Sequence, residues 1–442
     1  MKTQVAIVGG GPSGTVSAMW LKKHGIDSVI IERAKFPRFH TGESTTGECG
    51  ANIRALGLED EMMKRKFPVK TGAATYGVNG YKWDLPLCGR DADWKLFPSY
   101  TWQLRRDEFD KLMLDSAISR GVDFVQGQVI KPIVDDSGAV RGLTVRPNEG
   151  NVFDIESEIV LDCSGLNTFL ANAGVTGPKY SGNYDKQVAI FSQVAGTIRG
   201  EGIGPNDTLL FYRAKHQWGW FIPLDDDLVS VGVVTPAAYF KQKRESKSDF
   251  LQRELRELNP ELSRRIPDTT LHDDVRSIPN YSYQVRRFCG KGFICVGDSH
   301  RFLDPIFSYG VCVSMYEARQ AANAVKDYFA GKHRDADNPF ADYALMVERG
   351  SDVAEDVMDA FWEHPFAFAR TVFTQRDEMI DIFAGRVWQR QPSVATDKLR
   401  RFLKRERAYN NTVGDEYSVP IGSRYHPERA HIWEEADDPA LA

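Results

Sequence analysis

The stretch VAIVGGGPSG, from Val5 to Gly14, decides the fold of this chain. A short apolar run ends in three glycines, and the segment from Ser13 to His24 has the pattern of a helix. Gly9, Gly11 and Gly14 fulfil the pattern Gly-x-Gly-x-x-Gly. The first glycine permits a tight turn, the second lets the backbone approach a pyrophosphate, and the third lets the helix pack against the strand. The stretch therefore predicts a strand, a glycine turn and a helix whose N-terminus binds phosphate.

A second apolar run, from Ser28 to Glu32, ends in an acid about twenty residues after the glycines. In a βαβ unit, an acid at this spacing is placed to bind a ribose hydroxyl of a dinucleotide. We therefore predict a dinucleotide site rather than an ordinary strand, turn and helix, and FAD and NAD are both open at this point. The residues assigned to the site are Gly9, Gly11, Pro12, Ser13, Gly14, Glu32 and Arg33.

Composition excludes several classes of protein. The chain has 442 residues, 42% of them hydrophobic and 26% charged, and its net charge of −5 does not favour a nucleic-acid partner. The length predicts two or three subdomains. Runs long enough for a transmembrane helix or a signal peptide are absent from the sequence, as are CxxC, HxxxH and HExxH spacings. We expect a cytoplasmic protein with six reduced, mostly buried cysteines and no metal site.

The rest of the chain predicts further elements of both kinds. Residues 187–234 alternate apolar and polar side chains, which favours an antiparallel sheet on the substrate side. The last hundred residues have a helical pattern and carry a basic run, KLRRFLKRER, at 398–407. Further strands are expected at 122–126, at 158–162 and in GFICVGD from Gly292, and a long helix at 313–329.

Two later segments resemble the cofactor motifs of the FAD-dependent monooxygenase superfamily. They are VLDCSG at 160–165 and FICVGDSHRFLDPIFSYGVCVSM at 293–315. In that superfamily the aspartate here numbered Asp298 binds the ribitol or ribose part of FAD. QLRRDEFDKLML, at 103–114, resembles the segment whose arginine, here Arg106, contacts the cofactor. The FAD residues that the resemblance implies are Gln103, Arg106, Val129, Asp162, Gly165, Gly297, Asp298, Pro305, Gly310 and Val311.

The resemblance sets the expected fold class and domains. The class is α/β, with an FAD-binding Rossmann-type domain, an interleaved antiparallel sheet on the substrate side and a helical C-terminal region. The FAD-binding module covers 1–330, with the sheet inserted at about 60–110 and 185–280, and the helical region covers 331–442. Because the sequence has no second Gly-x-Gly-x-x-Gly, we expect no NADPH domain. The flavin is then reduced by another protein or by nicotinamide that binds transiently, and we predict a separate flavin reductase as partner.

WGWFIP, from Trp218 to Pro223, is similar to WxWxIP, a motif of the flavin-dependent halogenases. By itself it is also compatible with a tryptophan-rich strand. DPIFSYGV is similar to the halogenase segment DPxFSxGV, in which the backbone amides corresponding to Tyr309 and Gly310 hold chloride. The wall residues that the resemblance implies are Trp218, Trp220, Ile222 and Pro223.

Two shorter segments extend the resemblance to the halogenases. FPVKTGAA places Lys70 at the family's catalytic lysine, although a lysine alone is more often a surface residue. FPRFHTGES resembles the family's flavin-contacting loop and implies Gly42, Glu43 and Ser44. Here the chain continues as GESTTGE, without the proline that usually follows in the family. This departure concerns the geometry of the flavin-side loop.

The resemblance implies a reaction. Reduced FAD, oxygen and chloride or bromide yield hypohalous acid, which is relayed to Lys70 and halogenates an electron-rich aromatic ring. Lys70 would either form a haloamine or polarise the hypohalous acid. Tryptophan halogenases have a glutamate where this chain has Phe307, so we expect a phenol-like or pyrrole-like substrate, free or tethered to a carrier protein. The basic run at 398–407 is either a docking site for an acidic carrier or a solvated helix face.

Three other functions remain open from the sequence. One is an FAD-dependent monooxygenase that hydroxylates its substrate without a halide. Another is an enzyme similar to geranylgeranyl reductases, whose aromatic motif ends in Phe-Pro where this chain has Ile222-Pro223. The third is a non-catalytic flavin-binding partner, which the presence of Lys70 and of the glycines does not favour.

Overall fold

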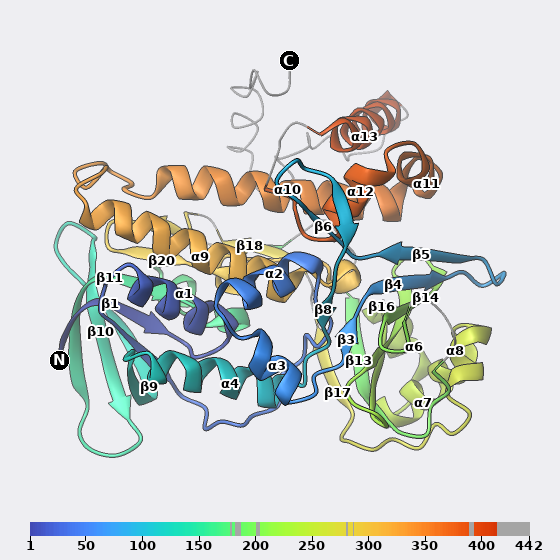
Figure 1. The fold of residues 1–442 in the computed structure, drawn as a ribbon, viewed down its shortest axis with the longest axis horizontal. Helices are drawn as coiled ribbons and strands as arrows, with labels where there is room; N and C mark the ends of the chain where they lie inside the picture. The colour runs from blue at the N-terminus through green and yellow to red at the C-terminus, as the bar shows by residue number, and fades with distance from the viewer. Residues whose placement is uncertain are drawn as a thin grey trace.

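Two sheets lie at opposite ends of the long axis of the molecule, and long helices run across them (Figure 1). The structure, a computed structural model, describes residues 1–176, 179–181, 187–199, 204–279, 282–285, 287–388 and 393–412.

The N-terminal sheet is parallel at its centre. β1 lies between β2 and β11, β2 also pairs with β9, β11 also pairs with β20, and all four pairings are parallel. β10 closes the far side antiparallel to β9 and β11, and β19 pairs antiparallel with β20. The strands are β1 (Lys2–Val8), β2 (Ser28–Glu32), β9 (Asp123–Val134), β10 (Val140–Pro147), β11 (Phe153–Asp162), β19 (Cys289–Gly290) and β20 (Phe293–Cys295).

Helices cover this sheet and bury its central strands. All five residues of β2 are buried, as expected for a parallel strand with both faces covered. α1 (Pro12–Lys23) begins with a proline, whose missing N–H would have no intrahelical partner in the first turn. It packs against α4 (Arg106–Ser119) and α9 (Tyr309–Phe329). The predicted strand, glycine turn and helix are therefore present.

The second sheet is antiparallel except where β14 pairs with β4. Its order is β17–β13–β16–β15–β14–β4–β5. The antiparallel sheet predicted at 187–234 forms its centre. The strands are β4 (Gly72–Tyr76), β5 (Lys82–Pro86), β13 (Gln187–Val194), β14 (Thr208–Ala214), β15 (Gln217–Pro223), β16 (Val229–Pro236) and β17 (Arg276–Pro279).

Short helices pack against one face of the second sheet. α6 (Ala237–Lys243), α7 (Lys247–Glu257) and α8 (Pro260–Arg265) follow β16 along the chain, and Phe250 and Leu262 are fully buried in the core that they share with this sheet. The remaining smaller elements are α2 (Gly47–Ala55), α3 (Glu59–Lys64), β3 (Val69–Lys70), β6 (Cys88–Arg90), β7 (Leu96–Pro98), β8 (Thr101–Trp102), α5 (Phe169–Asn172), β12 (Lys179–Ser181), β18 (Tyr283–Val285) and β21 (Arg301–Phe302).

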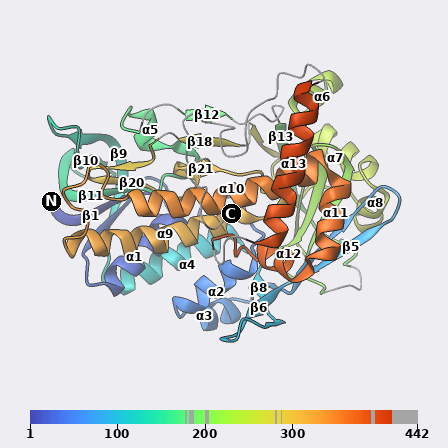
Figure 2. The same cartoon turned by 90° about the horizontal axis from the view of Figure 1, so that it is seen from above.

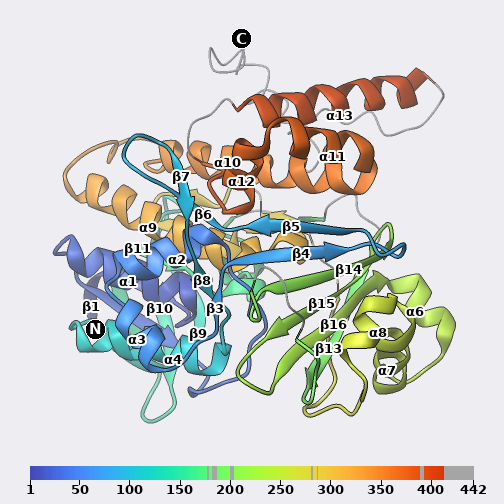
Figure 3. The same cartoon turned by 45° about the vertical axis from the view of Figure 1, so that its right-hand side comes forward.

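The C-terminal helices form a layer over both sheets. α10 (Ala341–Glu363) lies beside α9, and α11 (Pro365–Thr374) lies beside α13 (Val394–Thr412) (Figure 2). α11, α13 and α12 (Arg376–Phe383) lie above β4 and β5 (Figure 3). Ring contacts of Trp83 on β5 with Phe368 and Phe383, at centroid distances of 5.9 and 5.5 Å, fasten this layer to the second sheet.

The predicted α/β class is confirmed, but several boundaries differ. β9 and β11 are longer than the strands predicted at 122–126 and 158–162, because antiparallel pairing with β10 extends them beyond the parallel part of the sheet. α9 begins at Tyr309 rather than at Val313, since the chain turns into the helix at Ser308.

The basic run at 398–407 lies on α13 and is not a uniformly solvated face. Leu399 and Leu403 are buried, and the Arg400 guanidinium donates to Asp356 of α10 at 2.7 Å. Lys398 and Arg401 are exposed. The side chains of 404–407 lie outside the described residues.

Candidate functional site

A cavity of about 500 Å³ opens between the two sheets. It is lined by the glycine turn, the ends of β2 and β11, the loop at 38–44, β15 and the start of α9. Of the residues predicted to bind the cofactor, those on its wall are Gly9, Gly11, Pro12, Ser13, Glu32, Arg33, Gly42, Glu43, Ser44, Arg106, Val129, Gly165, Asp298, Pro305, Gly310 and Val311.

The three glycines of the turn have different surroundings. Gly9 has a φ of +104°, and a Cβ there would lie 2.5 Å from the Cys163 carbonyl oxygen. A Cβ on Gly14 would lie 2.0 Å from the carbonyl oxygen of Gly9, so Gly14 lets the helix approach the turn and does not itself line the cavity. At Gly11 the nearest atom to such a Cβ is Arg38 Nη2, at 3.7 Å. The Gly11 backbone is therefore open to a ligand at the N-terminus of α1.

Glu32 lies at the end of β2 with its carboxylate beside the glycine turn. Oε2 accepts a hydrogen bond from the Gly10 amide at 2.8 Å, and Oε1 accepts one from the Ala34 amide at 2.6 Å. Its side chain is buried but remains on the cavity wall. These bonds fix the carboxylate where a ribose would lie if a dinucleotide occupied the turn.

Arg106 holds the loop at 38–44 in place. Its guanidinium donates to both carboxylate oxygens of Asp110, at 2.8 and 3.0 Å, and to the Thr41 carbonyl oxygen. Arg38 reaches the same Asp110 carboxylate at 3.2 Å. The Arg106 guanidinium is thus largely committed to the protein, although its side chain still reaches the cavity.

Asp298 lies in a 3-10 turn, Gly297–Ser299, directly after β20 and on the cavity wall. Burial raises the pKa of its carboxyl to about 7, against the opposing effect of Arg106. The turn is fastened from behind by the Gly297 amide, which donates to Glu317 of α9 at 2.6 Å. Asp298 can therefore accept hydrogen bonds from a ligand hydroxyl at a fixed position.

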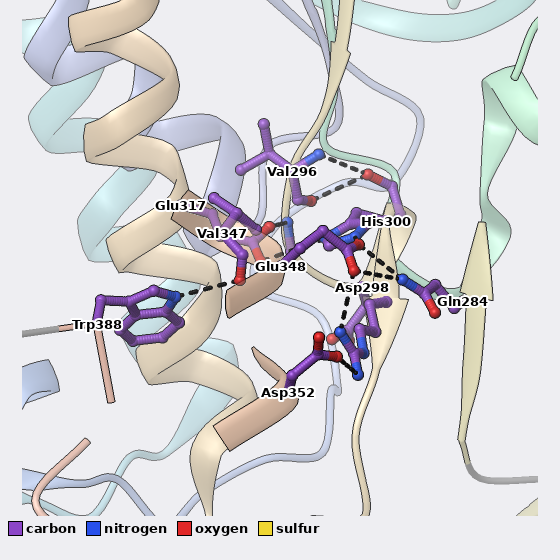
Figure 4. Close-up of polar contacts among 12 residues, drawn as sticks. Gln284, Val296, Asp298, His300, Glu317, Val347, Glu348, Asp352 and Trp388 are labelled. Atoms are coloured by element: carbon purple, nitrogen blue, oxygen red, sulfur yellow. Dashed lines mark hydrogen bonds and ion pairs between the residues drawn. The ribbon is translucent and has the colours of Figure 1, made fainter. Parts of the chain in front are cut away.

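A buried ionic network connects this turn to α10 (Figure 4). His300 Nε2 lies 2.7 Å from Glu348 Oε1, and its Nδ1 lies 3.4 Å from Glu317 Oε1. Burial alone lowers the pKa of His300, but the two carboxylates outweigh burial and raise it. Arg301 extends the network to Asp352 at 2.7 Å. The 3-10 turn Gly297–Ser299, called the GD turn below after Gly297 and Asp298, is thereby linked to the C-terminal helical layer.

Three further predicted cofactor residues, like Gly14, lie behind the cavity wall. The Gln103 amide nitrogen donates to the Asn206 carbonyl oxygen and to Thr208 Oγ1, each at 2.9 Å. Asp162 accepts from the amides of Ser164 and Leu170 at the end of β11. Together with Gly297, these residues shape the wall without lining it.

Lys70 is buried at the end of β3, and only 4% of it is exposed. Nζ donates to Ser44 Oγ at 2.9 Å and to the Thr45 carbonyl oxygen at 2.8 Å. Burial lowers the pKa of the amine to about 8, while Asp207 and Cys49 oppose this shift. Lys70 is therefore not a surface lysine. It is separated from the cavity by Ser44, which lines it.

The tryptophan motif forms one wall of the cavity. Trp218, Trp220 and Ile222 point inward from β15, while Pro223 ends the strand and does not line the cavity. Trp220 Nε1 donates to Ser230 Oγ at 3.1 Å, and this hydroxyl donates to Glu43 Oε1 at 3.2 Å. Hydrogen bonds thus connect the tryptophan wall to the loop at 38–44, called the GES loop below after Gly42, Glu43 and Ser44.

The predicted halide site lies at the N-terminus of α9. Gly310 lines the cavity, and a Cβ there would meet nothing within 4 Å. The Tyr309 side chain points away and donates its hydroxyl to the Ile382 carbonyl oxygen at 2.7 Å. Amides in the first turn of a helix have no intrahelical acceptor, which suits them to bind an anion.

Two of the cavity-wall residues that sequence reasoning did not single out have hydroxyl groups next to Ser44. Thr208 begins β14, and its hydroxyl lies 2.7 Å from Ser44 Oγ. Ser308, just before α9, has a φ of +59° and places its hydroxyl 3.0 Å from Ser44 Oγ. Ser308 stood within the DPIFSYGV segment, whereas nothing in the sequence marked Thr208.

The donor set fits FAD and gives no support for a metal. The open glycine turn, the helix N-terminus, Glu32 and Asp298 provide groups for a pyrophosphate, a ribose and a ribityl chain. Trp218 Nε1, on the cavity wall, has no hydrogen-bond partner within the part of the chain that the structure describes. Among the described residues, the His, Cys, Asp and Glu side chains form no group of three or more that could hold a metal ion.

Two further features concern the cysteines and the helices. All six cysteines are free thiols, and five of them are buried. None of the helices in the described ranges combines the length and apolar character needed to cross a membrane.

Comparison with known proteins identifies close relatives. Residues 2–337 match the family model of the FAD binding domain. The chain is 33% identical over 384 residues to 1H-pyrrole-2-carbonyl-[peptidyl-carrier protein] brominase of Pseudoalteromonas luteoviolacea, covering 86% of this chain and 91% of that protein. It is 26% identical over 432 residues to the corresponding chlorinase of Pseudomonas fluorescens, covering 90% and 92%. The solved structure of the flavin-dependent brominase Bmp2 superposes with a TM-score of 0.86 at 32% identity, covering 92% of this chain and all of that one.

Proposed function

This chain belongs to the flavin-dependent halogenases, and from that premise we propose that it brominates or chlorinates a pyrrole ring tethered to a peptidyl carrier protein as a pyrrole-2-carbonyl group. The two relatives that match 86% and 90% of its length are named for this substrate. Phe307, where tryptophan halogenases have a glutamate, fits the same choice. The hydroxylase and the reductase considered from the sequence are not favoured, because these relatives are halogenases.

The observation that carries the proposal is the buried Lys70 amine next to a cavity walled by Trp218 and Trp220. The amides of Tyr309 and Gly310 would bind chloride or bromide at the N-terminus of α9. When bound, reduced FAD supplies the oxygen activation that oxidises the halide to hypohalous acid. The tryptophan wall would keep the substrate away from the flavin, so the oxidant has to reach the end of the cavity next to Lys70.

Lys70 would act on the oxidant as a hydrogen-bond donor. With a pKa of about 8, the amine is mostly charged at neutral pH. An ammonium group polarises hypohalous acid, whereas a haloamine requires the neutral amine. Of the two routes that the sequence left open, the geometry and charge of Lys70 therefore favour polarisation.

The test is a reconstituted reaction. The protein, FAD, NADH, a flavin reductase and bromide are incubated with a carrier protein loaded with pyrrole-2-carboxylate. We expect a mass increase with the isotope pattern of bromine on the carrier-bound pyrrole, with little product from free pyrrole-2-carboxylate or from tryptophan. A hydroxylated pyrrole without halogen would overturn the halogenase assignment, and preferred halogenation of a free phenol would overturn the tethered substrate.

A further inference from the structure

Three hydroxyl groups meet beside Lys70 and form a cluster that the halogenase motifs do not explain. The cluster consists of Ser44, Thr208 and Ser308. Ser44 Oγ lies at its centre, 2.7 Å from Thr208 Oγ1 and 3.0 Å from Ser308 Oγ. The Lys70 amine is the fourth member of the contact, at 2.9 Å from Ser44 Oγ.

The chemistry of these groups sets the direction of the hydrogen bonds. A charged lysine can only donate, so Ser44 Oγ accepts from Lys70. A serine hydroxyl has a single proton. The Ser308 hydroxyl donates to Ser44 Oγ, so Ser44 can donate its own proton to Thr208 or to a group in the cavity. The Gln103 amide nitrogen already donates to Thr208 Oγ1 at 2.9 Å. The order of donation therefore runs from Lys70 to Ser44, and from Ser44 to Thr208 or into the cavity.

The cluster also lies between Lys70 and the cavity. Ser44, Thr208 and Ser308 are on the cavity wall, whereas Lys70 is not. Ser308 directly precedes the two residues whose amides are assigned to the halide. Four separate segments converge here: the GES loop, β3, the start of β14 and the turn before α9. An oxidant formed in the cavity would meet the Ser44 hydroxyl before it met the amine.

We propose that Ser44 is a catalytic residue, which holds the Lys70 amine in place and relays its proton to the oxidant in the cavity. This inference rests on the proposed halogenase function. Lys70 acts through Ser44, because the other acceptor of its amine is the Thr45 carbonyl oxygen, which has no proton to pass on.

Three proton transfers accompany the halogenation. The ring carbon of the substrate attacks the halogen of hypohalous acid, the carbon–halogen bond forms, and the electron pair of the oxygen–halogen bond stays on oxygen. That oxygen takes the proton of Ser44 and leaves as water, while Ser44 takes a proton from the Lys70 ammonium. The ring then loses its own proton, which returns the amine to its charged form. The net change is the replacement of ring hydrogen by halogen, with water as by-product.

Removal of the Ser44 hydroxyl has a defined effect on the titration of Lys70. The ionisable groups that influence the amine are Asp207, next to the start of β14, and Cys49 on α2. Neither changes in Ser44→Ala, but the ammonium loses one of its two acceptors. A charged form with fewer acceptors is less stable, so the pKa of Lys70 falls further below its ordinary value.

The experiment measures brominated product against pH in the reconstituted reaction with carrier-bound pyrrole. In the wild type, product formation should decline above about pH 8, where the ammonium is lost. Ser44→Ala should form product at least about tenfold more slowly, and its alkaline limb should lie about one pH unit lower. Ser44→Thr, which keeps the hydroxyl, should recover both the rate and the limb.

A matched control and a second readout separate this role from a structural one. Ser192 is similarly buried on β13 and donates to the Asp273 carbonyl oxygen, so Ser192→Ala removes a buried hydroxyl and its hydrogen bond away from the cavity. It should leave the limb in place. The pH dependence of Lys70 carbamoylation by cyanate, followed by peptide mass spectrometry, reports the titration of the amine without turnover. Its midpoint should fall in Ser44→Ala and also in Ser44→Cys, which keeps the side-chain volume with a weak acceptor.

The outcomes are distinguishable. A wild-type rate and an unchanged alkaline limb in Ser44→Ala, or an unchanged carbamoylation midpoint in both Ser44 variants, would overturn the relay while leaving the halogenase intact. If Ser44→Ala does not retain FAD, Ser44→Cys decides on the same two criteria. Full halogenation by a Lys70→Ala protein would instead defeat the proposed function on which the relay rests.

Discussion

Lys70 separates the making of the oxidant from its use. The amine lies behind Ser44 and outside the cavity wall, so its loss should leave FAD binding unchanged. Lys70→Ala should therefore bind FAD and consume oxygen after reduction, yet lose halogenated product by about 10²–10⁴-fold or more. Oxygen uptake and product are measured in the same reaction mixture.

Lys70→Met is the matched variant, because it keeps most of the side-chain volume without the amine. It should behave like Lys70→Ala if the amine is responsible, and FAD absorbance should be normal in both. A joint loss of FAD binding and product would assign Lys70 a structural role, and near-normal product would remove it from the mechanism.

At the scale of elements, two glycines at the start of α1 differ in the space around them. Gly11 has φ and ψ of −75° and −172°, an extended conformation open to any residue, and free space faces its missing side chain. Gly14 faces the carbonyl oxygen of Gly9. Gly11→Val should keep the fold but weaken FAD binding by about tenfold or more, which corresponds to 1.4 kcal/mol. Gly14→Ala should lower the free energy of unfolding by about 2 kcal/mol or more, because the helix has to move.

Thermal unfolding without added flavin, together with FAD titration, distinguishes the two glycines. Equal losses of stability in both variants would contradict the roles assigned to them. So would FAD affinity that stays unchanged in Gly11→Val.

The packing of α9 and α10 against the GD turn depends on His300. Replacing it with glutamine removes a buried cation between Glu317 and Glu348, and breaking such a pair costs about 3–5 kcal/mol. The folded-state pKa of His300 is raised, so its contribution is fully present below the unfolded value of about 6.5 and is lost as pH rises through the folded pKa. The difference in Tm between wild type and His300→Gln should therefore be largest near pH 6 and shrink at alkaline pH. A difference independent of pH would show that His300 is neutral in the folded protein.

For the molecule as a whole, local signals in the sequence predicted the frame of the fold. The apolar runs before Gly9 and up to Glu32 encode a βαβ unit within about thirty residues, and the alternation after residue 187 encodes the second sheet. The layer formed by α10–α13 over that sheet depends on contacts such as Trp83 with Phe368, which are distant in sequence and leave no periodic signal.

The site shows the same division between local and distant information. Sequence motifs predicted the site residues near Gly11, Asp298 and Gly310, because each of these parts of the site is formed by one short segment. Thr208 was missed because its role arises only from its distance to Ser44. Arg106 was expected to contact the cofactor, and its commitment to Asp110 was not foreseen, although an acid four residues along a helix is in reach of an arginine.

The last prediction at the scale of the whole chain concerns the reductant of the bound flavin. The sequence contains a single Gly-x-Gly-x-x-Gly, which lies on the wall of the cavity that fits FAD. Hydride transfer from NADPH requires the nicotinamide to be held against the flavin, and a second nucleotide motif that could hold it is absent from the sequence. NADPH alone should therefore reduce the bound flavin slowly, and a separate flavin reductase should restore turnover. Stopped-flow absorbance measures the reduction under anaerobic conditions.

As a control, chemically reduced FAD mixed with the protein and then with oxygen and bromide should give product without any nicotinamide. Rapid bleaching of the flavin by NADPH alone would contradict the need for a partner and would indicate a nicotinamide site formed without the motif.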